Sequence, residues 1–138
     1  MSTNTAFRRD IDKFIRKSKD ATDDFVRAVV LNIDQRVVLK SPVRSGRFRN
    51  NWNVGNGSID TGTNEGVDPS GSAQIAKAAA ELQSISINGQ TIYVTNSLVY
   101  SYRLEYEGWS KQAPNGMVRI TLAEINSVMK DAAFEVKR

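Results

Sequence analysis

The sequence predicts an α+β fold, with a long N-terminal helix and a C-terminal helix packed on a small, mainly antiparallel β-sheet. Apolar residues recur three to four positions apart over the first forty residues and again after residue 116, which is the spacing of one helical face. Between these regions, apolar residues alternate around an Asn-Gly pair, a pattern typical of strands joined by a tight turn. The length of 138 residues fits a single domain spanning residues 1–138.

Composition excludes several classes of function. The chain has neither cysteine nor histidine, so disulfides, the usual zinc sites and a histidine general base are ruled out. We therefore expect no catalytic residues, no cofactor, no metal and no enzymatic activity. The first five residues lead into charges instead of an apolar secretory segment, and no run of about 18 apolar residues occurs. These features predict a soluble, non-exported protein that does not contact a membrane.

The net charge of +4 is unevenly distributed. Residues 1–52 hold 12 Lys and Arg against 6 Asp and Glu, a balance of +6, whereas residues 53–138 hold 7 against 9, a balance of −2. A nucleic-acid-binding protein usually carries a larger basic excess. The asymmetry suggests instead that the two halves meet electrostatically, within one subunit or between neighbours.

Residues 7–40 are expected to form the long helix, as a core element with no chemical role. Its apolar face is formed by Phe7, Ile11, Phe14, Ile15, Ala21, Phe25, Val29, Ile33 and Val37. Midway, residues 17–20 interrupt this face with polar side chains, and residues 22–24 have the capping and acidic types that begin a helix. We therefore expect a break or kink there.

A turn should follow the helix at residues 41–52. Pro42 cannot continue a helix, Gly46 permits a positive φ, and Phe48 and Trp52 are the large apolar side chains that can re-enter the core. We expect Trp52 to be a core anchor.

Three arginines, Arg44, Arg47 and Arg49, lie on this turn without an acid among them. Such a cluster is either a solvated basic turn or a contact surface for a partner or for DNA phosphates.

A short strand is predicted to begin at Asn53 and to lead into a long polar loop at about residues 55–72. The loop has few apolar residues, so we expect it to become ordered only against a neighbouring subunit. Its acids and amides lack the spacing of an EF-hand, so calcium binding is not expected.

Three further elements are predicted before the last helix. Alanine-rich residues 73–82 favour a short helix, and residues 84–87 and 91–95 are expected to pair as a hairpin around Asn88-Gly89. Residues 96–108 could form a strand by their tyrosines, but their apolar spacing favours a short helix.

Glu105 and Glu107 are of the residue type that forms the paired carboxylates of a glycosidase, but on a helix they point apart and are expected to be surface charges. Trp109 and Lys111 follow in an exposed loop, where Trp109 is expected to be a contact residue. The last helix should run from Met117 with one continuous apolar stripe and pack across the sheet beside the first helix.

Two segments resemble a known family. Ser-Pro-Val-Arg-Ser-Gly-Arg-Phe-Arg-Asn-Asn-Trp (residues 41–52) and Leu-Glu-Tyr-Glu-Gly-Trp-Ser-Lys-Gln-Ala-Pro-Asn-Gly-Met-Val-Arg (residues 104–119) are similar to the signature segments of tail-completion and neck proteins of tailed bacteriophages. The chain departs from the family pattern at Arg44-Ser45, where Asp-Thr is frequent, and at the inserted Glu107.

The resemblance implies a structural virion protein of the head–tail junction, a non-enzymatic ring subunit that joins the tail to the DNA-filled head. It implies a homo-oligomeric ring, a hexamer or dodecamer, that contacts head-side connector or adaptor proteins and tail tube or tail terminator proteins, with non-specific contact to passing DNA. The location implied is the virion, and the host cytoplasm during assembly. The predicted assembly or channel contacts are Arg44, Arg47, Arg49, Glu105, Glu107, Trp109 and Lys111.

Alternatives remain open at this point. Tail termination cannot be separated from tail completion. A DNA-binding accessory protein would use the three arginines with Trp52, whereas a small hydrolase is disfavoured by the missing histidine and cysteine. Within the ring hypothesis, we expect the arginine turn of one subunit to form bidentate pairs with Glu105 or Glu107 of the next, in a head-to-tail contact.

Overall fold

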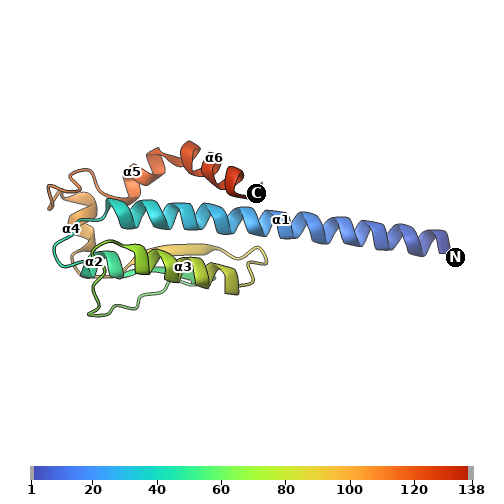
Figure 1. Ribbon diagram of the computed structural model, residues 1–138, viewed down its shortest axis with the longest axis horizontal. Helices are drawn as coiled ribbons and strands as arrows, with labels where there is room; N and C mark the ends of the chain where they lie inside the picture. Colours follow the sequence, from blue (N-terminus) through green and yellow to red (C-terminus); the bar gives the residue numbers. More distant parts are fainter. Residues whose placement is uncertain (1, 137–138) are drawn as a thin grey trace.

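The longest element is a single helix that runs through the whole molecule (Figure 1). The computed structural model describes residues 2–136, and α1 spans Ser2–Lys40 without interruption. The break expected near residues 17–24 was wrong. Thr22 does not begin a second helix, because its hydroxyl donates a hydrogen bond to the Ser18 carbonyl, 2.9 Å away and one turn earlier.

Shorter elements surround the C-terminal half of α1. They are α2 (Arg47–Asn50), β1 (Trp52–Asn56), α3 (Ser72–Ser84), β2 (Ile92–Asn96), α4 (Ser101–Tyr106), α5 (Val118–Ala123) and α6 (Ile125–Val136). Figure 1 shows α3 and the strands on one side of α1, and α5 and α6 on the other. The predicted α+β fold is confirmed, with α1 as its middle layer.

The sheet consists of β1 and β2, paired antiparallel with Val54 opposite Val94. The predicted hairpin was therefore wrong in its partner. The turn itself forms, because Asn88 and Gly89 have positive φ angles of 44° and 72° and the Gln90 N–H donates to the Ile87 carbonyl at 2.8 Å. The segment before the turn does not pair, because α3 extends to Ser84 and Ile87 enters the core.

The C-terminal region forms two helices instead of the single one predicted. They meet at Glu124, whose carboxylate is bound by Arg36 and Lys40 of α1 at 3.0 and 2.7 Å. The two ion pairs fix the junction to α1. Val128 and Ala132 of α6 are buried, which confirms that the C-terminal region packs beside the first helix. The prediction that it packs across the sheet was wrong, because α6 lies on the side of α1 opposite to the strands (Figure 1).

A buried polar cluster joins α1, α3 and β1. The Gln74 side-chain amide donates to the Asp34 carboxylate and to the Trp52 carbonyl, both at 3.0 Å, while the Gln74 N–H donates to Asp68 at 2.9 Å. Asp34 is fully buried and its second oxygen has no partner within residues 2–136. Burial raises the pKa of Asp34 from 3.8 to about 6, although the Gln74 bond opposes the shift.

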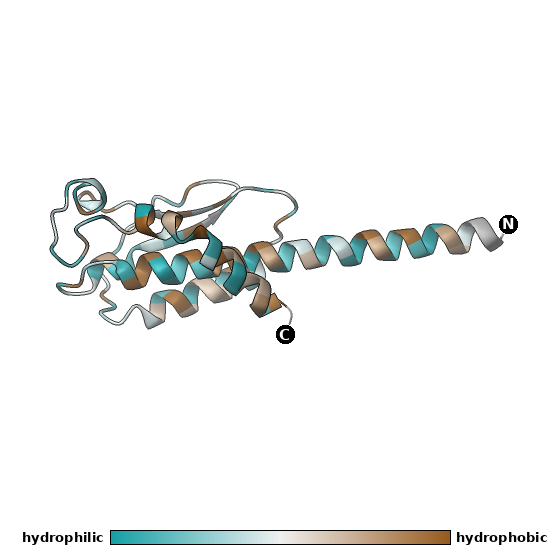
Figure 2. Ribbon diagram, turned by 90° about the horizontal axis from the view of Figure 1, so that it is seen from above, coloured by the Kyte–Doolittle hydropathy of each residue, from teal (hydrophilic) through white to brown (hydrophobic). Residues whose placement is uncertain are grey.

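Beyond this body, the N-terminal half of α1 projects alone (Figures 1 and 2). Lys19 touches the turn of the body through a 2.7 Å hydrogen bond to Asn88, and residues 5–22 are all exposed. Within residues 2–136, none of the helices has the length and apolarity needed to cross a membrane.

Candidate functional site

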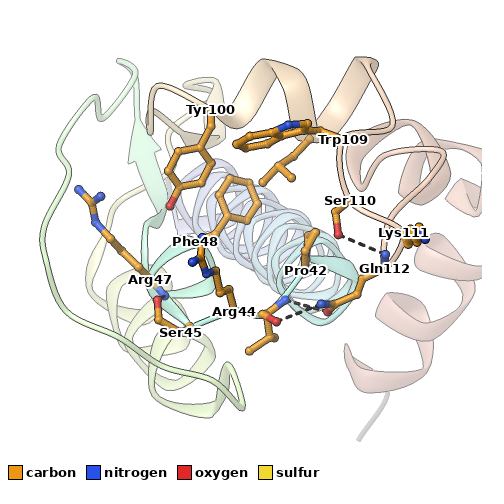
Figure 3. A pocket seen from close by; sticks show the side chains of 13 residues that line it. Pro42, Arg44, Ser45, Arg47, Phe48, Tyr100, Trp109, Ser110, Lys111 and Gln112 are labelled. Carbon is orange, nitrogen blue, oxygen red and sulfur yellow. Dashed lines mark hydrogen bonds between the residues drawn. The ribbon is translucent and has the colours of Figure 1, made fainter.

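The two segments with the family resemblance lie against each other in the structure. The Val43 N–H donates to the side-chain oxygen of Gln112 at 2.9 Å, and the Gln112 side-chain amide donates to the Val43 carbonyl at 3.0 Å. A pocket of about 580 Å³ opens between the segments (Figure 3). Its walls comprise residues 42–48, Tyr100, Leu104 and residues 109–112.

Gly46 shapes the first segment. Its φ of 95° lies in the left-handed region, and a Cβ at this position would overlap the backbone of Pro69. The Asp68 N–H donates to the Gly46 carbonyl at 3.0 Å. The turn is therefore held against the end of the polar loop. Arg44, two residues before Gly46, is exposed and lines the pocket.

Trp52 is the core anchor that the sequence predicts. Its side chain is 4% exposed, and its indole N–H donates to the Ser41 hydroxyl at 2.8 Å. The Ser41 hydroxyl in turn donates to the Val37 carbonyl at 2.6 Å. These bonds fix the ring of Trp52 to the C-terminal end of α1. They also give the buried indole N–H a hydrogen-bond partner inside the core.

Two of the three arginines are engaged within their own chain. Arg47 donates to the Asn64 carbonyl at 3.2 Å and pairs with Glu65 at 3.1 Å. Arg49 donates to four backbone carbonyls at 3.0–3.3 Å, those of Leu39, Ser41, Pro69 and Ser70. Because two of these carbonyls lie at the end of α1, Arg49 caps the helix and complements its dipole.

The polar loop between β1 and α3 is attached to the body of its own chain. The Asn51 side chain accepts from the Asn64 N–H at 2.8 Å and donates to the Asn64 carbonyl at 3.1 Å. Earlier in the loop, Asn53 donates to the Gly62 carbonyl and Thr95 to the Asp60 carbonyl, both at 2.8 Å. The prediction that this loop becomes ordered only against a neighbour was therefore wrong, because side chains of β1 and β2 and of residue 51 satisfy its backbone.

Glu105 is a buried capping residue, which corrects its prediction as a surface charge. It is 6% exposed, and its carboxylate accepts the N–H groups of Met117, Val118 and Arg119 at 2.7–3.2 Å, together with the Arg119 guanidinium. Burial raises the pKa of Glu105, but these hydrogen bonds outweigh it and hold the pKa below 4.5. A Cβ at Gly116 would collide with this carboxylate. Glu105 is therefore occupied within its own chain.

A row of aromatic rings connects the core to the pocket. Ring centroids lie 5.8 Å apart for Trp52 and Phe48, 5.9 Å for Phe48 and Tyr100, and 6.2 Å for Tyr100 and Trp109. The Trp109 ring also lies 5.7 Å from the Arg103 guanidinium. Although it is packed at one end of this row, Trp109 remains 58% exposed.

The pocket brings together four of the seven predicted contact residues, namely Arg44, Arg47, Trp109 and Lys111 (Figure 3). The other three lie outside its walls and are Arg49, Glu105 and Glu107. In Figure 3, Tyr100 and Trp109 lie along the upper edge and Arg44 and Arg47 along the lower left.

The charges left at this surface are few. Arg44 and Lys111 are exposed and make no ion pair within residues 2–136, while Glu107 has only a loose 3.9 Å pair with Arg103. Sequence reasoning missed Tyr100 and Gln112 as pocket residues. Gln112 could have been found from its place inside the second of the two segments. Tyr100 lines the pocket because its ring packs against Phe48, a contact that the sequence does not indicate.

Among residues 2–136, no group of three or more acidic side chains is arranged to hold a metal ion. Two acids of the polar loop bind backbone N–H groups instead: Asp60 accepts from Gly62, and Asp68 from Gln74. Comparison of the chain with protein-family models, with curated proteins and with solved structures finds no match.

Proposed function

We propose that this chain is a structural subunit of a ring at the head–tail junction of a tailed bacteriophage, where it completes the tail and joins it to the DNA-filled head. One observation carries the proposal. The two segments that resemble tail-completion and neck proteins are held together by Val43 and Gln112, 69 positions apart, and form one site.

Much of each segment has a structural role that accounts for its residue types. Ser41 and Trp52 close the end of α1, Gly46 packs on Pro69, and Glu105 caps α5 beside Gly116. Because residues of both segments stabilise the same part of the fold, the two segments are needed together. This supports treating them as one motif. What remains outside is a basic and aromatic surface of Arg44, Trp109 and Lys111.

This surface suits a protein contact. An exposed tryptophan supported by neighbouring rings, with cationic side chains beside it, is the composition of an interface hot spot. The ring partners proposed are a neighbouring copy, a head-side adaptor, or a tail tube or terminator protein. Tail termination is the alternative position within the same junction.

DNA binding is the competing function, and the contacts disfavour it. Of the residues such a protein would use, Trp52 is buried, and Arg47 and Arg49 are bound to their own chain. At the pocket this leaves Arg44 and Lys111, which offer few phosphate contacts, and affinity for DNA depends on the number of such contacts.

The test has two parts. Electron microscopy of the purified full-length chain should show closed rings. Addition of the chain to heads and tails prepared from particles that lack it should restore joining, and Trp109→Ala should abolish that effect while Lys130→Glu, an exposed change on α6, should retain it.

Failure to restore joining, with salt-sensitive binding of the chain to short duplex DNA, would replace this function by the DNA-binding one. Restored joining by Trp109→Ala at the level of the unaltered chain would remove the pocket from the interface.

A further inference from the structure

The projecting part of α1, residues 7–18, is here named the arm. Its apolar side chains fall at helical spacing on one face, and their exposed fractions are large: Phe7 65%, Ile11 41%, Phe14 70% and Ile15 56%. At 1.5 Å per residue the arm is about 18 Å long. Figures 1 and 2 both show it extending away from the body.

An arm of this kind calls for a partner. Helices of this length are marginal in water unless an apolar face packs on something, and clustered exposed apolar side chains mark interaction sites. Its own body cannot be that partner. α1 is continuous from Ser2 to Lys40, so the arm cannot turn back without breaking the helix.

The body carries an apolar groove of about 390 Å³ between the polar loop and α4 and α5. Its exposed apolar walls are Ile59, Tyr102, Tyr106 and Val118, and the rings of Tyr102 and Tyr106 lie 4.9 Å apart. The groove lies beside Trp52 and Phe48, which pack at the C-terminal end of α1. The arm and the groove are therefore at opposite ends of one molecule.

The charges of the two surfaces are complementary. The arm holds five basic and two acidic residues, a balance of +3. The polar loop beside the groove, residues 57–71, holds three acidic residues and no basic one, a balance of −3, while the Arg119 guanidinium lies 5.0 Å from the Tyr106 ring of the groove wall. Two arms paired with each other would place +3 against +3, so arm-to-groove pairing is electrostatically preferred.

We propose that the arm of one copy lies in the Ile59, Tyr102, Tyr106 and Val118 groove of the next copy. This inference rests on the proposed function as a ring subunit. Because the two complementary surfaces differ, the contact is heterologous, and repetition of a heterologous contact closes into a ring when the rotation permits. The apolar face of the arm supplies the buried anchors, and its basic residues meet the acidic loop beside the groove.

The absence of cysteine allows a direct test by cross-linking. Ile11→Cys places a thiol on the arm and Ser97→Cys places one in the groove wall. With a short bismaleimide, the double variant should give a ladder of covalent oligomers up to the ring size. A mixture of the two single variants should give dimers only, and each single variant alone should give none.

Dimers from Ile11→Cys alone would indicate arm-to-arm pairing and overturn the proposal. Rings seen by electron microscopy without a ladder would also overturn it while leaving the ring function intact. The absence of both rings and a ladder would contradict the ring function and the docking of the arm.

A second measurement avoids cysteine chemistry. Phe14→Ser should shift the assembled chain to monomers in light scattering with no loss of thermal stability of the dilute monomer, because the side chains of the arm are exposed. Asp12→Ser, a matched change on the same arm that removes no apolar contact and increases its positive charge, should leave the assembly intact. Loss of assembly in both variants, or in neither, would contradict the docking of the apolar face.

Discussion

The two halves of α1 have the same kind of sequence and different surroundings. Val37 and Val38 in the C-terminal half are buried against Trp52, Leu98 and the rest of the core. Phe14 in the N-terminal half, at an equivalent place in the apolar pattern, is 70% exposed. The comparison teaches that an amphipathic pattern specifies a face that must be covered, while the covering element comes from the rest of the chain or from another molecule.

The largest effect should come from removing the anchor of the covered half. Trp52→Ala should lower the free energy of unfolding by about 3–5 kcal/mol, because it removes a large buried ring and a hydrogen bond to Ser41. Chemical denaturation of the dilute monomer measures this loss. Phe14→Ala on the arm is the control and should change the unfolding free energy by less than about 0.5 kcal/mol. Equal losses in both variants would show that the arm is packed in the monomer.

Asp34 tests the polar contact that joins α3 to the covered half. Its folded pKa of about 6 exceeds the unfolded 3.8, so the contribution of Asp34 to stability is most favourable in acid, becomes less favourable as the pH rises from about 4 to about 6, and is constant above that. Asp34→Asn should therefore raise the unfolding free energy by roughly 2–3 kcal/mol at pH 7.5. At pH 4 the gain should vanish. Urea titrations at the two pH values check this, and a gain that is constant with pH would contradict the ionised buried carboxylate.

Glu105 should show the opposite pH dependence. Its folded pKa lies below the ordinary 4.5, so its contribution is present above that value and is lost as the pH falls through the folded pKa. Glu105→Gln should cost about 1–3 kcal/mol at pH 7, since the cap of α5 loses its charge. The two proteins should converge in acid. A variant as stable as the unaltered chain at pH 7 would remove Glu105 from the structural part of the motif.

Trp109 should affect stability less than Trp52, Asp34 or Glu105. Trp109→Ala should cost less than about 1 kcal/mol in the monomer, because the ring is mostly exposed and packs on Tyr100 and Arg103 at one end of the aromatic row. Its effect should appear instead in the joining of heads and tails. Thermal unfolding and the joining assay on one preparation separate the two roles, and an unfolded variant would show that Trp52 and Trp109 are both core residues.

Sequence predictions that rest on neighbouring residues were correct more often than those that depend on contacts between distant segments. Local signals were reliable: α1, the Trp52 anchor and the Asn88-Gly89 turn are all present. The partner of β2 was missed, because strand pairing depends on the distant β1 and on where α3 ends. α1 also continued through residues where capping types suggested a break, since Thr22 bonds within the helix.

The site was predicted in part for the same reason. The two signature segments were found from their residues, but the roles of Arg49 and Glu105 depend on backbone groups that the sequence does not place nearby. From the sequence, Glu105 is expected to be a surface charge, because the N–H groups that bind its carboxylate belong to residues 12 to 14 positions later. The exposure of the arm could not be read from its periodicity, because the pattern is the same whether the face is covered or bare.

Hydrogen exchange along α1 tests the central claim most directly, because it reports both halves of one helix in one experiment. In the dilute monomer, amides of residues 7–18 should exchange rapidly and those of residues 30–40 slowly. In the proposed ring, residues 7–18 should become protected while residues 30–40 change little. Slow exchange of the arm in the monomer, or equally fast exchange of the arm in both states, would contradict the account.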